Sequence, residues 1–191
     1  MRVFKFGGAS VKDAESVKNV GQILSMFRKE KIIVVISAMG KMTNALEKVV
    51  QAYVGKSDEL PALIEEVKTF HTKIIDDLGF APNHDLRGEV QNSFTEIDWI
   101  IEEEPTRSYG FYYDQVVSHG ELISTKILSA YLNENKIENS WLDIRDVLQT
   151  DNNYREAKVN YDLTGKLIAE RIPVLFEKKN FIITQGFIGA T

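Results

Sequence analysis

The sequence contains no cysteine, and this absence excludes disulfide frameworks, thiolate catalysis and cysteine-ligated zinc sites. It also lacks an apolar run near the roughly 18 to 20 residues that a membrane-spanning helix requires. The amino terminus passes directly into a strand-like pattern rather than a signal peptide. We therefore expect a soluble, cytoplasmic protein without a membrane partner.

Basic residues are not in excess, because 23 Lys and Arg stand against 28 Asp and Glu and give a formal net charge of −5. Nonspecific binding to nucleic acids or anionic membranes depends on a basic surface, so neither is an expected partner. Any bound phosphate must then be held by a local site. The three histidines, His71, His84 and His119, lack the spacing of metal ligands, and no metal site is predicted.

The composition is that of a folded domain, with 43% hydrophobic and 27% charged residues among 191. Four short segments rich in β-branched or aromatic residues have the pattern of strands: 3–6, 32–37, 141–144 and 181–185. A helical pattern with Asp13 as its N-cap joins the first two strands into a right-handed βαβ unit. Because the second segment is apolar on both faces, we expect an α/β fold with a mainly parallel sheet between helices.

Between the second and third strands, the apolar residues follow helical spacing. This pattern predicts a helical insertion over about 43–135, with Gly79 ending its second helix. The insertion either builds a wall of a substrate site or only shields the sheet. A last helix is predicted over about 163–172, ending before Pro173. The 181–185 strand would then form a sheet edge able to pair with another copy.

The first chemical motif is KFGGAS, residues 5–10, at the end of the first strand. Its two glycines let backbone N–H groups approach an anion closely, and a following helix start adds free donors and a favourable dipole. Lys5 supplies a compact positive charge. The motif predicts a phosphate site, although a Gly-Gly turn after a strand is also a common structural feature.

The second motif, ISAMGKMTN, contains the end of the second strand and the loop after it. Ligands of open parallel sheets bind outside the carboxyl ends of the strands, so this loop should lie beside the first motif. Thr43 and Asn44 would then offer a hydroxyl and an amide to a ligand. The alternative is that Thr43 only caps the next helix.

The third motif, SHGE, lies within a helical region. A glycine in a helix costs about 1 kcal/mol relative to alanine, so Gly120 indicates close approach by a ligand or by another backbone. The adjacent Glu121 would suit a cationic amino group. The alternative is a surface glutamate beside a glycine that packs against another helix.

Five segments occur in order along the chain: KFGGAS, ISAMGKMTN, SHGE, DIRDVLQTDNNYREA and FIITQGFIG. Together they resemble the amino-terminal portion of the aspartate kinases, a branch of the amino acid kinase family. The resemblance covers essentially the whole chain and implies a three-layer αβα sandwich of the carbamate kinase-like type. It also implies ATP-dependent phosphorylation of the L-aspartate β-carboxylate to 4-phospho-L-aspartate, the first step of lysine, threonine and methionine biosynthesis.

The resemblance further implies which residues bind each substrate. Lys5 would be the catalytic residue. The phosphate of ATP would be held by Lys5, Phe6, Gly7, Gly8 and Ser10. L-Aspartate would be contacted by a second group: Thr43, Asn44 and Glu121. Mg²⁺ would arrive with the nucleotide, and a homo-oligomer is expected for the full-length enzyme. Arg145 and Asp146 are expected to form an internal ion pair or loop anchor.

The chain departs from the family pattern in two places. Ala9 stands where the family usually has threonine, and we predict a small effect on phosphate binding. The family also continues past FIITQGFIG into further nucleotide-binding loops and regulatory domains. We therefore expect residues 1–191 to be the amino-terminal part of one kinase domain, truncated before the nucleotide-binding half and inactive alone. The alternatives are another amino acid kinase, or a noncatalytic binding or assembly module on the same half-sheet.

Overall fold

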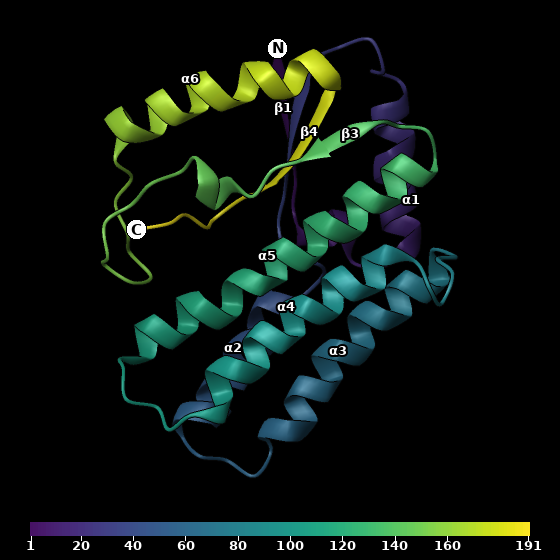
Figure 1. Cartoon of the computed structure of the whole chain (residues 1–191). Helices are drawn as coiled ribbons and strands as arrows, with labels where there is room; N and C mark the ends of the chain where they lie inside the picture. Colours follow the sequence, from purple (N-terminus) through teal and green to yellow (C-terminus); the bar gives the residue numbers. More distant parts are fainter.

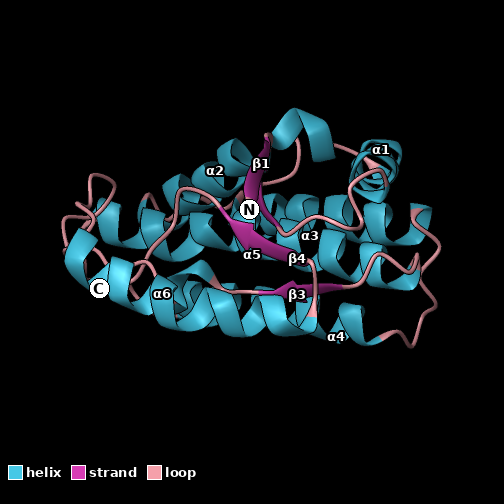
Figure 2. Cartoon of the chain, turned by 90° about the horizontal axis from the view of Figure 1, so that it is seen from above, coloured by secondary structure: helices cyan, strands magenta, loops and turns pink.

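The computed structural model describes residues 1–191 and is built on one four-stranded parallel sheet (Figure 1). Its strands are β1 (Arg2–Phe6), β2 (Ile32–Ile36), β3 (Asn139–Trp141) and β4 (Phe181–Gln185). They lie in the order β1-β2-β4-β3, and every neighbouring pair is parallel. The strand direction changes steadily from β1 to β3, which is the normal twist of such a sheet (Figure 2).

Helices join each strand to the next, as parallel pairing requires. The six α-helices are α1 (Ala14–Ser25), α2 (Met42–Val54), α3 (Leu60–Asp77), α4 (Asp85–Glu102), α5 (Tyr109–Glu134) and α6 (Tyr161–Lys178). Four of them, α2 to α5, lie between β2 and β3 in the chain, which confirms the predicted helical insertion. No helix combines the length and the apolar character needed to cross a membrane.

The helix ends follow local signals in the sequence. The Asp13 side chain accepts a hydrogen bond from the backbone N–H of Ser16 at 2.8 Å, so Asp13 is the N-cap of α1 as predicted. Gly79 follows the end of α3 with φ at +85°. The backbone N–H of Phe80 bonds back to the carbonyl of Ile75, which is the pattern of a glycine-terminated helix.

The sheet separates two hydrophobic cores and is the middle of three layers, which confirms the predicted αβα sandwich. On one face, Ile32, Val34 and Ile36 are fully buried and belong to a large core shared with α1 to α5. On the other, Ile182 packs into a smaller core with residues of α6. Figure 1 shows α6 on one side of the sheet and α5 on the other. Burial of each large aliphatic side chain contributes about 1.5–3 kcal/mol to stability.

The last helix is longer than its sequence pattern predicts, because α6 continues through Pro173 to Lys178. Proline lacks the N–H that would bond to the carbonyl four residues earlier. The apolar stripe nevertheless continues past it, and Ile172 and Phe176 both pack into the smaller core. Tertiary packing therefore outweighs the local helix-breaking preference.

Two strand expectations are also corrected. The third strand lies at 139–141 rather than 141–144, because Asp143 accepts a hydrogen bond from the Arg145 backbone at 3.0 Å and starts a short 3₁₀ helix, η2 (Ile144–Asp146). The 181–185 strand is not a sheet edge, since β4 pairs with β2 on one side and β3 on the other. Pairing with another copy through β4 is thereby excluded.

Candidate functional site

Three strands end at the same level and bring three loops together. Phe6, Ile36 and Gln185 are aligned across β1, β2 and β4. The loop after β1 begins with Gly7, the loop after β2 with Ser37, and the last segment of the chain follows β4. The first two predicted motifs therefore share the carboxyl edge of the sheet, where ligands of such folds bind.

Gly7 and Gly8 differ in what surrounds them. Gly7 precedes the 3₁₀ helix η1 (Gly8–Val11), and no atom lies within 4 Å of the place where its Cβ would be. A Cβ on Gly8 would lie 2.6 Å from the carbonyl oxygen of Ala38 and 2.8 Å from that of Gly40. Gly8 therefore permits the two loops to touch, whereas Gly7 leaves its backbone open to a ligand.

Lys5 lies on β1 with its side chain exposed at the carboxyl edge. Its Nζ lies 4.3 Å from the centroid of the Phe187 ring, a cation–π contact. Phe187 is 81% exposed and has a φ of +65°, which is uncommon for a residue with a side chain. The FIITQGFIG pattern identifies this segment, but the position of Phe187 over Lys5 depends on tertiary structure and was not predicted.

Two other residues predicted to bind phosphate, Phe6 and Ser10, follow Lys5 in the chain. The Phe6 side chain packs against the large core on the opposite face of the sheet, and its carbonyl accepts a hydrogen bond from the Ser37 N–H at 3.2 Å. Ser10 is half-buried within η1, where its N–H bonds to the Gly7 carbonyl at 2.8 Å. The Ser10 hydroxyl has no hydrogen-bond partner in the chain and is free to meet a ligand.

Thr43 and Asn44 lie in the first turn of α2. The helix begins at Met42, Lys41 holds the N-cap position and no side chain caps it, so the alternative that Thr43 is the N-cap is wrong. Thr43 is half-buried and Asn44 is exposed. Neither side chain hydrogen bonds within the chain, so both remain available at the carboxyl edge.

Glu121 is a buried carboxylate on α5 and only 5% exposed, so it is not a surface residue. Burial raises its pKa to about 7, while backbone hydrogen bonds at Glu121 itself and at Ala38 act in the opposite direction. Glu121 forms no ion pair with a Lys or Arg of the chain. Its ionised form therefore lacks a counter-charge from the protein.

Gly120 allows α5 to come close to the loop after β2. A Cβ at this position would lie 3.0 Å from Leu46 Cδ1 and 3.1 Å from Ala38 Cβ. The sequence predicted close approach by a ligand or by another backbone, whereas the nearest atoms here belong to the side chains of Leu46 and Ala38. This close packing brings Glu121 to the same loop that contacts Gly8.

Arg145 forms an ion pair, but not with its sequence neighbour Asp146. Its guanidinium contacts the Asp143 carboxylate at 2.6 Å, and Asp143 also caps η2. Arg145 therefore anchors the loop after β3. His119, beside Gly120, is 3% exposed, and burial first and nearby Arg145 second lower its pKa to about 4.

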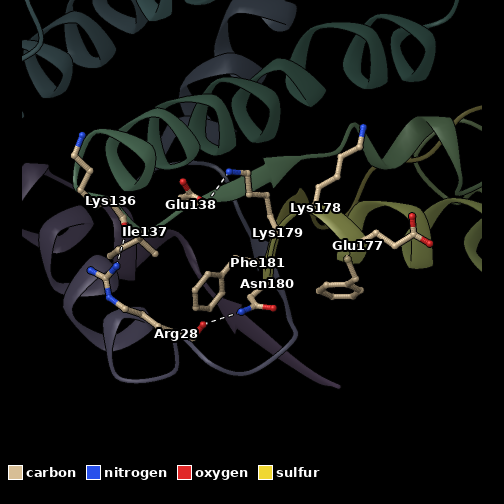
Figure 3. Close-up of a pocket in the computed structure, with 10 residues that line it drawn as sticks. Arg28, Lys136, Ile137, Glu138, Glu177, Lys178, Lys179, Asn180 and Phe181 are labelled. Atoms are coloured by element: carbon tan, nitrogen blue, oxygen red, sulfur yellow. Dashed lines mark hydrogen bonds and ion pairs between the residues drawn. The ribbon is translucent and has the colours of Figure 1, made fainter.

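A hollow of about 320 Å³ lies at the other end of the sheet, near Asn180 at the start of β4 (Figure 3). Two of its four cationic side chains, Arg28 and Lys179, have partners within the protein, whereas the ammonium groups of Lys136 and Lys178 have none. Arg28 donates to the carbonyl of Lys136 beyond the end of α5, and Lys179 pairs with Glu138 at 2.7 Å. Cations are favourable near helix carboxyl termini. This hollow is therefore separate from the residues at the carboxyl edge of the sheet.

Known proteins are similar to this chain over most or nearly all of its length. Lysine-sensitive aspartokinase 3 of Escherichia coli is 29% identical over 98% of the chain, and chloroplastic aspartokinase 1 of Arabidopsis thaliana is 36% identical over 69%. The matches cover 40% and 23% of those two proteins, so the chain spans less than half the length of these relatives.

Solved structures show the same similarity. Escherichia coli aspartokinase III in complex with aspartate and ADP superposes with a TM-score of 0.87 at 28% identity, over 99% of this chain and 41% of that one. The same enzyme with lysine and aspartate gives a TM-score of 0.88. The model of the amino acid kinase family matches residues 1–191. Because this family model matches every residue from 1 to 191, the chain belongs to the amino acid kinase family.

Proposed function

We propose that this chain binds L-aspartate and takes part in its ATP-dependent phosphorylation to 4-phospho-L-aspartate, the first step of lysine, threonine and methionine biosynthesis. The similarity to aspartokinases supports the reaction, and a similar structure was solved with aspartate and ADP. The enzyme class is a phosphotransferase with a carboxyl group as acceptor.

The observation that carries the proposal is the buried carboxylate of Glu121. A carboxylate removed from water is stabilised strongly by a cation, and the chain supplies none near it. The α-ammonium group of an amino acid would supply that charge. Glu121 therefore favours an amino acid over a plain dicarboxylate. Thr43 and Asn44, in the first turn of α2, would donate to or accept from the polar groups of the same ligand.

The phosphate side of the site is Lys5 with the glycine loop. Phosphoryl transfer requires positioning and charge stabilisation rather than covalent chemistry. Lys5 and the open backbone at Gly7 fit this role, because they present a positive charge and an approach free of side chains. The acceptor is already a carboxylate, so no strong general base is needed. Mg²⁺ would be carried by ATP and would neutralise its phosphate charge.

The proposal extends to the whole protein. We place it in the cytoplasm and expect a homo-oligomer for the full-length enzyme. Because the chain corresponds to about 40% of its Escherichia coli relative, we assign residues 1–191 to the amino-terminal part of one kinase domain. We expect this part alone to bind L-aspartate without forming aspartyl phosphate, which hydroxylamine trapping measures.

The test is calorimetric titration of the 191-residue chain with L-aspartate and with succinate, which lacks the ammonium group. L-Aspartate should bind at least about tenfold more tightly, and Glu121→Gln should remove most of that difference. Lys5→Ala is the matched control and should leave L-aspartate affinity within about threefold. Equal binding of succinate would show that the role of Glu121 is wrong. Absence of binding by any amino acid would favour a noncatalytic module.

A further inference from the structure

A single buried hydroxyl group joins α5 to the ends of two strands. Thr125, one helical turn beyond Glu121, is fully buried, and its Oγ1 accepts hydrogen bonds from Trp141 Nε1 at 2.9 Å and Gln185 Nε2 at 2.7 Å. Its own proton faces the carbonyl oxygens of Glu121 and Leu122, each 3.0 Å away. A hydroxyl has one donor and two lone pairs, so this junction is fully satisfied.

The orientation of the Gln185 side-chain amide is determined by the hydrogen bond that its oxygen accepts. Gln185 Oε1 accepts a hydrogen bond from the backbone N–H of Ile144 at 2.8 Å. Because that N–H can only donate, the amide oxygen must face Ile144 and the amide nitrogen must face Thr125. Gln185 is 2% exposed, so neither end exchanges its partner for water. The junction therefore has one arrangement of donors and acceptors.

The junction at Thr125 is connected to two parts of the proposed site, the turn of α5 that contains Glu121 and the segment that follows β4. The Thr125 hydroxyl bonds to the backbone of Glu121 itself. Gln185 is the last residue of β4 and is followed by the segment that places Phe187 over Lys5. A change at Thr125 would thus move the helical turn that holds Glu121 relative to the carboxyl edge of the sheet.

We propose that Thr125, held by Gln185 and Trp141, is a positioning residue. It holds the Glu121 carboxylate in the position where it binds the ammonium group of an amino acid substrate. This inference rests on the proposed function. Thr125 touches no substrate in this scheme, because it acts through the backbone of Glu121. Its removal should therefore weaken substrate binding by displacing a group that remains chemically intact.

Ser129 provides a matched control on the same helix. Its hydroxyl is buried and donates to Asn139 Oδ1 at 2.7 Å, so it also joins α5 to β3. It lies two turns beyond Glu121 and contacts the amino end of the strand. Ser129→Ala therefore removes a comparable buried hydrogen bond without altering the junction at Thr125.

The experiment compares L-aspartate affinity among variants of the 191-residue chain by calorimetry. Thr125→Val leaves the buried Gln185 donor and the partly buried Trp141 donor without an acceptor and should raise the Kd at least about tenfold. Thr125→Ser restores the hydroxyl and should return the Kd to within about threefold of the parent chain, and Ser129→Ala should stay within about twofold. Equal effects of Thr125→Val and Ser129→Ala would overturn the inference.

Two further measurements distinguish a variant that does not fold, and a failure of the proposed function, from a failure of this inference. If Thr125→Val does not fold, Trp141→Phe removes only one donor and should raise the Kd about threefold; an unchanged Kd would contradict the inference. If the parent chain binds no L-aspartate, the proposed function fails. The positioning role is then tested by ¹³C NMR titration of the Glu121 carboxyl group. Its midpoint should move by at least about 0.5 pH unit in Thr125→Val and not in Ser129→Ala, and unmoved midpoints in both would overturn it.

Discussion

Two adjacent glycines have different physical reasons for lacking a side chain. At Gly8 the carbonyl oxygens of Ala38 and Gly40 occupy the space that a Cβ would need, and the Gly40 N–H bonds to the Gly8 carbonyl at 3.0 Å. At Gly7 that space is empty. One glycine thus belongs to loop packing, and the other keeps the backbone accessible beside Lys5.

This difference predicts opposite results for two alanine substitutions. Gly8→Ala should destabilise the fold by about 1–3 kcal/mol, because backbone atoms cannot yield as flexible side chains do. Gly7→Ala should change stability by less than about 0.5 kcal/mol and instead weaken binding of ATP. Urea denaturation gives the stabilities, and nucleotide titration of the full-length enzyme gives the binding. Equal stability loss in both variants would contradict the distinction.

Local patterns predicted several residues of the site and missed others. Lys5, Gly7 and Glu121 were identified because a charge, a glycine pair and a helical glycine are visible within a few residues of sequence. Their assigned roles remain predictions. Thr125 and Phe187 were not assigned, because the contact of Thr125 with Gln185 and that of Phe187 with Lys5 join positions about 60 or more residues apart that only the folded chain brings together.

At the scale of secondary structure, α6 shows the strongest conflict between local preference and packing. Pro173 lies inside the helix, yet Ile172 and Phe176 on either side of it are buried in the smaller core. The sequence predicted a helix end at this proline from a sound local rule. The rule failed because the apolar stripe continues for another turn and packs against β4.

Replacing this proline tests how much stability the helix loses to it. Pro173 is exposed, so Pro173→Ala removes no buried contact and allows the missing backbone hydrogen bond to form. We expect the free energy of unfolding to increase by about 1–3 kcal/mol, measured by urea denaturation. Ala169→Gly, in the preceding turn, is a control that should lower stability by about 1 kcal/mol. A less stable Pro173→Ala variant would show that the proline supports the helix.

Helix and strand positions were otherwise well predicted where hydrophobic periodicity was long. The insertion expected at about 43–135 occupies α2 to α5, which run from Met42 to Glu134. The third strand was displaced because it has only three residues and ends at a turn capped by Asp143. Sheet order was not predicted correctly, since the place of β4 inside the sheet depends on contacts distant in sequence.

At the scale of the whole molecule, the fold brings two chemically distinct groups to one edge. Lys5 is a positive charge on one face of the sheet, and Glu121 is a buried negative charge on α5 at the other face. The loops after β1 and β2 touch at Gly8. This arrangement suits a reaction between a phosphate donor and an amino acid acceptor, each held by a charge of opposite sign.

Proton release on L-aspartate binding tests this arrangement most directly. With a pKa near 7, Glu121 is mostly protonated at pH 6, and an ammonium group beside it favours the ionised form. Binding at pH 6 should therefore release about one proton, binding at pH 8 almost none, and affinity should rise between these pH values. Calorimetry in buffers of different ionisation enthalpy measures this release, and Glu121→Gln should abolish it. A binding enthalpy independent of buffer at pH 6, or an unchanged buffer dependence in Glu121→Gln, would contradict the assignment of Glu121 to the substrate ammonium group.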